Sequence, residues 1–154
     1  MYIVRGRTAA TAATIDHAIF QVWNPHSTQR IKLIQWSIFK EAVGTAADGL
    51  RFRRTSARGT AGSTVTPTIE HHSERAIAPP SGFLLDLSAF SVQPTLVAGE
   101  LGQGWVASAV VGSGGVIAIP GGLIIPPGTG IVAIQTKATI WPISEVGVVV
   151  LEDW

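Results

Sequence analysis

Short apolar runs separated by turn residues follow one another along the whole chain, and helical periodicity is nearly absent. The runs are rich in Val, Ile, Trp and Phe, which favour strands. They predict strands at residues 2–7, 17–23, 29–40, 49–54, 64–71, 82–87, 91–98, 104–111, 116–119, 130–136, 138–143 and 145–151. Residues 40–47 are the single helical candidate. The pattern predicts an all-β fold, a jelly-roll-type β-sandwich with antiparallel strands. With residues 64–71 counted only as a possible edge strand, the pattern gives about ten or eleven strands against the eight of a basic jelly roll, so two or three are expected to be additional or wrong.

The run at residues 29–40 has the clearest alternation of apolar and polar positions, and this alternation changes phase. Leu33 has one parity, whereas Trp36 and Ile38 have the other. Because successive strand residues point to opposite faces, a change of parity within one strand predicts a β-bulge near Leu33.

Another predicted strand alternates strictly, with Leu50 and Phe52 on one face and Arg51 and Arg53 on the other. This is typical of a half-buried strand. It leads into a stretch rich in Ser, Thr, Gly and Ala at residues 55–68, which has too little apolar content to form core. We therefore predict a surface loop or arm there.

Residues 121–132 hold two apolar runs joined by a turn sequence, Pro126-Pro127-Gly128. Proline presets the second position of a turn, and glycine supplies the positive φ of the third. The segment predicts a hairpin or a corner. A phosphate-binding loop is the competing interpretation, but neither the Gly-Lys-Ser/Thr ending nor a following helix is present.

The length of 154 residues suits a single domain over residues 1–154, and charged residues make up only 14% of it. Soluble domains average about 25%. A surface so poor in charge, with a mean hydropathy of +0.35, is expected to be partly covered by subunit contacts. We predict a homo-oligomer, and specifically a trimer. The net charge of +1 provides no drive toward nucleic acid or an anionic membrane.

Residues 101–135 contain no charged side chain and are long enough to span a bilayer. Gly and Pro interrupt the segment every few residues, which would leave backbone groups unpaired in lipid, so no membrane partner is expected. Residues 1–7 lack the pattern of a signal peptide, and synthesis in a cytoplasm is expected. The absence of cysteine excludes disulfides and thiolate zinc sites.

The basic cluster of the chain consists of Arg51, Arg53, Arg54 and Arg58. Nucleic-acid grooves usually add aromatic stacking platforms, whereas here the nearby Phe52 lies on the opposite strand face from two of the arginines. Nucleic acid is therefore an unlikely partner. Because arginine is favoured at interfaces, we predict that the cluster pairs with acidic groups of a protein neighbour.

Histidine and tryptophan supply the remaining candidate chemistry. His71 and His72 lie between Glu70 and Glu74, but adjacent strand residues point to opposite faces, so a polar loop or interface is favoured over a metal site. No metal or other cofactor is predicted. The five tryptophans are expected to serve as core or interface contacts, although a sandwich that displays them can also be a carbohydrate-binding module. They are Trp23, Trp36, Trp105, Trp141 and Trp154.

Trp154 and the lack of catalytic motifs give two further expectations about function. The terminal Trp154 is expected to pack against a neighbouring subunit. The sequence holds no Gly-x-Ser-x-Gly elbow and no cysteine nucleophile, and its carboxylates are scattered, so an enzyme is not expected.

Two stretches resemble small virion proteins of tailed bacteriophages. One is RRTSARGTAGSTVTP at residues 53–67, and the other is residues 121–154 with PPGTGI and EVGVVVLEDW. In that group, jelly-roll decoration (cement) proteins bind the outer capsid, often as trimers, and brace neighbouring subunits. The resemblance implies a location on the virion and the major capsid protein as partner. A carbohydrate-binding jelly roll and a tail or head-fibre component remain alternatives.

Overall fold

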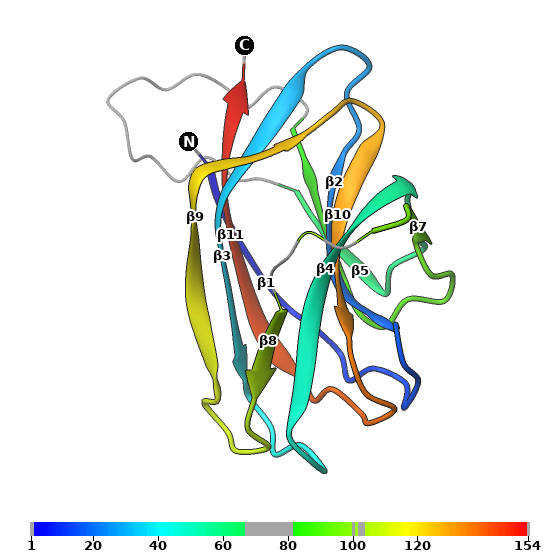
Figure 1. Ribbon diagram of the computed structural model, residues 1–154, viewed down its shortest axis with the longest axis vertical. Helices are drawn as coiled ribbons and strands as arrows, with labels where there is room; N and C mark the ends of the chain where they lie inside the picture. The colour runs from blue at the N-terminus through cyan, green and yellow to red at the C-terminus, as the bar shows by residue number, and fades with distance from the viewer. Residues whose placement is uncertain (1, 67–81, 100, 102–103, 154) are drawn as a thin grey trace.

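The computed structural model describes residues 2–66, 82–99, 101 and 104–153, which are built from strands and loops (Figure 1). The strands are β1 (Tyr2–Arg7), β2 (Ala18–Asn24), β3 (Arg30–Lys40), β4 (Asp48–Ala57), β5 (Ser63–Val65), β6 (Leu84–Leu87), β7 (Thr95–Leu96), β8 (Gly104–Ala107), β9 (Gly114–Ile125), β10 (Thr129–Gln135) and β11 (Ser144–Asp153). Among the described residues, no helix is long and apolar enough to cross a membrane.

The strands form two antiparallel sheets that pack face to face. Sheet A has the order β1-β11-β3-β9, and sheet B has the order β5-β6-β2-β10-β4-β7, with β8 also paired to β4. The pairs β1–β11, β2–β10, β3–β9 and β4–β8 are nested, so the first strand pairs with the last and the pairing continues inward. A nested arrangement rolled over two sheets is an eight-stranded jelly roll, and the predicted fold is confirmed.

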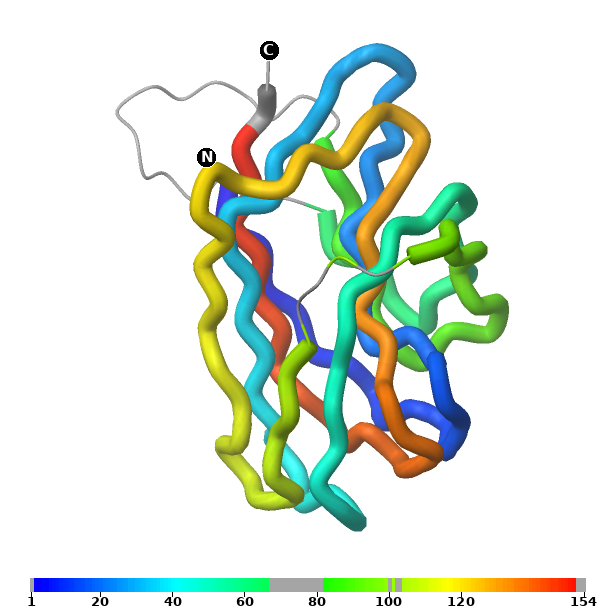
Figure 2. Tube along the Cα trace, in the orientation of Figure 1, coloured from blue at the N-terminus to red at the C-terminus, as the bar shows by residue number. Residues whose placement is uncertain are grey.

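The chain between β4 and β8 is an insertion into this jelly roll. Its β5 and β6 extend sheet B beyond β2, and its β7 pairs with the end of β4. Phe90 and Leu96 of the insertion pack against Val132 and Ile134, on the face of β10 that points away from sheet A. Figure 2 shows the insertion in green beside sheet B. Because β10 is buried on both faces, its sequence is a continuous apolar run.

The main core lies between the sheets and includes a group of four aromatic rings in contact with one another. The ring centroid of Trp36 lies 4.7 Å from that of Phe52 and 6.1 Å from that of Trp105. Phe20 lies 6.0 Å from Phe52 in an edge-on contact. Tilted and edge-on arrangements at these distances are favourable, and here they join strands of both sheets.

The predicted bulge in β3 is confirmed. In its pairing with β11, the adjacent residues Val149 and Val150 face Gln35 and Leu33, so Ile34 is an extra residue of β3. In the pairing of β3 with β9, the register jumps at the same place, and Leu33 and Gln35 face Leu123 and Ala118. One residue of β3 therefore faces the four residues 119–122 of β9. The alternation in the sequence changes phase at this bulge, because the apolar residues before it and those after it all point into the core.

Two predicted elements are wrong. Residues 138–143 form a loop, in which the fully buried Trp141 donates its backbone N–H to Thr11 Oγ1 and its indole N–H to Ser144 Oγ. These side-chain bonds replace a strand ladder. Residues 40–47 form a non-helical connection, because β3 extends to Lys40 in sheet A and β4 begins eight residues later in sheet B.

The surface loop or arm predicted at residues 55–68 is partly strand, although its described residues after Thr55 lie at the surface. β4 continues to Ala57 because Thr55 pairs with Gly130 of β10, and β5 follows at residues 63–65. Between them, Thr60 forms an isolated bridge with Val92. The part of the predicted edge strand 64–71 beyond residue 66 lies outside the described residues.

Residues 121–132 form a corner rather than a hairpin. β9 belongs to sheet A, whereas β10 belongs to sheet B, so the two strands do not pair with each other. Gly128 has the positive φ, 64°, that the turn sequence predicted. The turn thus carries the chain from one layer of the sandwich to the other.

Candidate functional site

Two arginines of the predicted cluster point away from the core, as the alternation of β4 indicated. Arg51 Nη2 lies 3.4 Å from Asp16 Oδ1. Arg53 Nη2 donates a 2.9 Å hydrogen bond to the carbonyl oxygen of Val97. Both guanidinium groups thus contact loops of their own chain on the outer face of sheet B.

The other two arginines point elsewhere. Arg54 shares the parity of Phe52, and its Nη1 donates a 3.1 Å hydrogen bond to the carbonyl oxygen of Ile124, so it bridges the two sheets. Arg58 Nε and Nη2 each lie 2.7 Å from one carboxylate oxygen of Asp86. The four arginines therefore do not form a single patch.

The remaining predicted site residues offer no exposed chemistry in the described part of the chain. Trp154, His71 and His72 lie outside it, so their roles stay predictions. Within the described ranges, no group of three or more His, Asp or Glu side chains is placed to hold a metal ion. Of the four described tryptophans, two are buried and two are half-buried, so none presents a fully exposed ring for stacking on a sugar. They are Trp23, Trp36, Trp105 and Trp141.

A different surface stands out at one end of the sandwich, which we call the loop end. It consists of the loops at residues 8–17, 41–47, 108–113 and 136–143, which lie together at the bottom of Figure 1. Of the eleven large apolar side chains that the described chain exposes, five lie in these loops. They are Ile15 (57% exposed), Val43 (72%), Val110 (62%), Val111 (52%) and Ile140 (43%).

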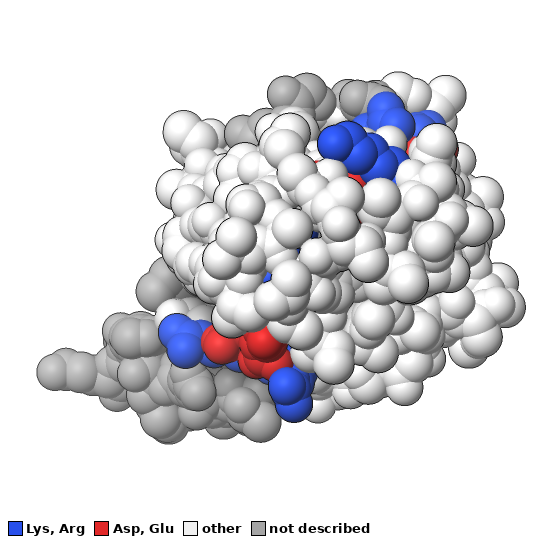
Figure 3. Space-filling model, turned by 90° about the horizontal axis from the view of Figure 1, so that it is seen from below, with Lys and Arg blue, Asp and Glu red and all other residues white. Residues whose placement is uncertain are grey.

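Charged side chains are few on the loop end, and each has a contact within the chain. Glu41 pairs with Arg7, and Asp16 pairs with Arg51. Lys137 Nζ donates a 3.0 Å hydrogen bond to a backbone carbonyl of the neighbouring loop. Figure 3 views this end and shows a broad uncharged surface with charged groups gathered at its margins.

The polar groups of these loops turn inward, where Gln135 is the main partner. Its Nε2 lies 2.9, 2.5, 3.1 and 2.9 Å from the carbonyl oxygens of Ala12, Thr14, Lys137 and Thr139. Its Oε1 accepts a hydrogen bond from Thr11, a further residue of the first loop. One fully buried amide thereby holds two loops together.

A buried lysine contacts two of the loops, at residues 108–113 and 136–143. Lys40 is 1% exposed, donates a 2.8 Å hydrogen bond to the carbonyl oxygen of Ser108, and lies 4.6 Å from the centroid of the Trp141 ring. Burial lowers the pKa of Lys40, and the charge of Asp48 opposes this effect. The buried Asp48 in turn accepts a 2.6 Å hydrogen bond from Thr139 Oγ1.

The loop end therefore has the reverse of the usual surface arrangement. Its polar groups are satisfied inside, and its aliphatic side chains point outward. Loops fixed in this way have little conformational freedom left to lose when a partner covers them. The arrangement suits the docking of an apolar protein surface.

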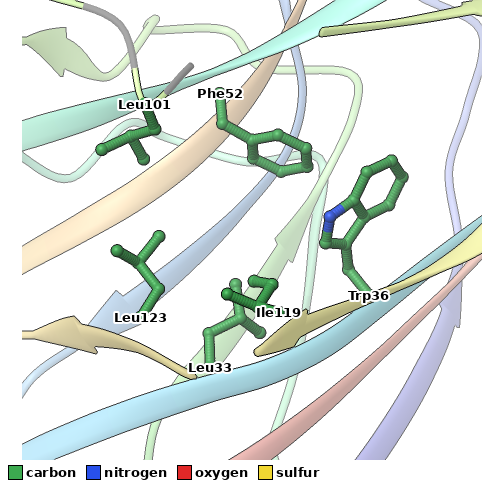
Figure 4. Close-up of a pocket in the computed structure, with 6 residues that line it drawn as sticks. All are labelled: Leu33, Trp36, Phe52, Leu101, Ile119 and Leu123. Atoms are coloured by element: carbon green, nitrogen blue, oxygen red, sulfur yellow. The ribbon is translucent and has the colours of Figure 1, made fainter. Parts of the chain in front are cut away.

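The second candidate site is a cavity of about 90 Å³ between the two sheets (Figure 4). It lies where β9 bulges away from β3. Six apolar side chains line it: Leu33, Trp36, Phe52, Leu101, Ile119 and Leu123.

Comparisons of the chain with protein-family models, with curated proteins and with solved structures find no match. The site is therefore interpreted from its own geometry.

Sequence reasoning missed both candidate sites. The uncharged segment at residues 101–135 was a signal for the loop end, because it contains Val110 and Val111. Gln135 and Lys40 gave no signal, since a single polar residue at the end of a predicted strand has many uses.

Proposed function

We propose that this chain is a structural protein of a bacteriophage virion that binds the outer surface of the capsid and stabilises contacts between subunits of the major capsid protein. The loop end is the observation that carries the proposal. It presents exposed aliphatic side chains on loops that are held rigid from inside. A surface of this kind binds its partner non-covalently, and no covalent bond is made or broken.

The chemistry of the loop end favours a protein partner. Its exposed side chains are mainly Val, Ile and small residues, with the charged Asp16, Glu41 and Lys137 among them, and it has no exposed tryptophan among the described residues. Sugars are usually bound by aromatic platforms with polar neighbours, which this surface lacks. The jelly-roll fold is shared by viral capsid proteins and lectins, so the fold alone does not decide between them.

Oligomerisation would strengthen such binding. A homotrimer that engages several lattice subunits makes the later contacts intramolecular, so weak individual contacts add up to firm attachment. Only 14% of the residues are charged, and this low fraction supports the proposal that the chain associates with copies of itself. Light scattering at micromolar concentration should give three times the chain mass of 16.2 kDa, and a monomer would contradict the trimer.

The docking role of the loop end is tested by replacing Val43 and Val110 with Asp, since a carboxylate cannot be buried unpaired in an apolar interface. The matched control is Val92→Asp, because Val92 is 58% exposed but lies on the insertion. Virions of the encoding phage, purified and analysed by quantitative mass spectrometry, should carry at least tenfold fewer copies of the double variant. The control should bind like the unchanged protein.

Two outcomes would count against the proposal. Undiminished occupancy by the double variant would remove the loop end from the docking surface. Absence of the unchanged protein from purified virions would overturn the proposed function as a whole.

A further inference from the structure

The cavity between the sheets has a structural cause in the bulge of β9. Residues 119–122 of β9 face one residue of β3, and Gly121 and Gly122 within them have φ values of 76° and 72°. Glycine adopts this backbone conformation at little cost, so the strand arches here. The cavity lies beneath the arch, with Ile119 before it and Leu123 after it as parts of its wall.

The wall contains one polar atom whose hydrogen-bonding capacity is unused. Trp36 is 1% exposed, and its indole Nε1 has no acceptor within hydrogen-bond distance among the described residues. Figure 4 shows this nitrogen on the side of the ring that faces the other lining residues. A buried donor without an acceptor destabilises the protein, so a molecule that supplies an acceptor to this N–H binds more favourably.

The cavity lies close to the edge of the sandwich between β4 and β9. β8 covers β4 only over the residues Asp48 to Arg51, and beyond that point Leu101 donates its backbone N–H to the carbonyl oxygen of Phe52. Among the described residues, Leu101 of a loop, rather than a strand, covers this part of the cavity.

We propose that this cavity binds a small apolar molecule that carries one hydrogen-bond acceptor, with the acceptor bonded to Trp36 Nε1. Six apolar side chains supply the contacts for the hydrocarbon part, and the indole N–H fixes its orientation. A cavity of about 150 Å³ holds benzene, so the 90 Å³ found here suits a molecule smaller than benzene. The proposal is independent of the virion role.

The probe is butan-2-one, with 2-methylbutane as a molecule of the same shape that lacks the acceptor. The readout is the indole N–H signal of Trp36 in the nuclear magnetic resonance spectrum of the ¹⁵N-labelled full chain, assigned by its loss in Trp36→Phe. Butan-2-one should move this signal downfield with half-saturation on the order of 10 mM. 2-Methylbutane should cause no downfield movement, because it cannot accept a hydrogen bond.

A matched pair of variants separates the cavity from the outer surface. Leu123→Phe fills the cavity and should raise the half-saturation concentration of butan-2-one at least tenfold. Ile124→Phe makes a similar change at the next residue, which is 37% exposed, and should leave it within twofold.

Three outcomes would overturn the proposal. They are an unmoved Trp36 signal, an equal downfield shift with 2-methylbutane, and equal binding by Leu123→Phe and the unchanged protein. If Leu123→Phe does not fold, nuclear Overhauser contacts between butan-2-one and the methyl groups of Leu33 in the unchanged protein decide the question. Their presence supports the site, and their absence contradicts it.

Discussion

Arg58 and Asp86 form a two-point ion pair in which both carboxylate oxygens accept 2.7 Å hydrogen bonds from the guanidinium group. Asp86 is completely buried, whereas the Arg58 side chain is 37% exposed. Thr64 Oγ1 donates a further 2.6 Å hydrogen bond to Asp86 Oδ1. The pair joins the end of β4 to β6, and its hydrogen bonds raise the pKa of Arg58. Arg58 therefore ties the start of the insertion, directly after β4, to its strand β6.

Replacing Arg58 by Ala should lower the free energy of unfolding by about 2–4 kcal/mol, because it leaves the buried Asp86 carboxylate without its main partner. Arg53→Ala is the matched control, since Arg53 donates to a single backbone carbonyl at the surface and should cost less than about 1 kcal/mol. Urea unfolding followed by tryptophan fluorescence measures both. Equal losses in the two variants would contradict the structural role of the pair.

Lys40 should make stability depend on alkaline pH. Burial holds its pKa below the 10.5 of the unfolded chain, so just below pH 10.5 the unfolded state binds more protons than the folded state. The free energy of unfolding therefore rises with pH through this window, and the gain is lost as the pH falls through the folded pKa. Lys40→Met has no such group, and the stability of the unchanged protein relative to this variant should increase toward pH 10.5 in urea titrations. A difference that stays constant would show that the ammonium group is not desolvated.

Gln135→Leu should loosen the loop end without changing the strands. The substitution keeps the approximate size of the side chain but removes the amide that serves the carbonyl groups of two loops. We expect a loss of about 2–3 kcal/mol in unfolding free energy, because several buried polar groups lose their partner. Hydrogen exchange should speed up in residues 9–16 and 136–141, and virion occupancy should fall with it. Unchanged exchange in these loops would separate Gln135 from the rigidity of the docking surface.

Two adjacent glycines in the arch of β9 provide an internal comparison. Both have positive φ, but a Cβ at Gly121 meets nothing within 4 Å, whereas one at Gly122 lies 2.4 Å from Lys32 Cγ. Gly121→Ala should lower the free energy of unfolding by about 1 kcal/mol, from backbone strain alone. Gly122→Ala should cost more, because the Lys32 and Ile34 side chains must also move. Thermal unfolding of both variants measures the difference, and equal melting temperatures would contradict this packing.

The alternation of apolar and polar residues by itself determined the strands and the faces they bury. It placed β1 at Tyr2–Arg7, put Leu50 and Phe52 in the core, and located the bulge near Leu33. These properties are local, because each residue's side of a strand depends only on its neighbours in the chain. The turn at Gly128 was predicted for the same reason.

Only the tertiary structure decided which strands pair and where polar side chains find partners. β1 pairs with β11, although the two strands are far apart in the sequence. This pairing is stabilised because it buries apolar surface between the two sheets, which no local sequence pattern encodes. In the folded sandwich, Arg58 pairs with Asp86, and Arg54 donates a hydrogen bond to the carbonyl oxygen of Ile124. The arginines of the basic cluster, which are neighbours in the sequence, therefore point in three different directions. Folding also gathers four separate loops around Gln135 and Lys40, where burying their polar groups forces their aliphatic side chains out to the surface.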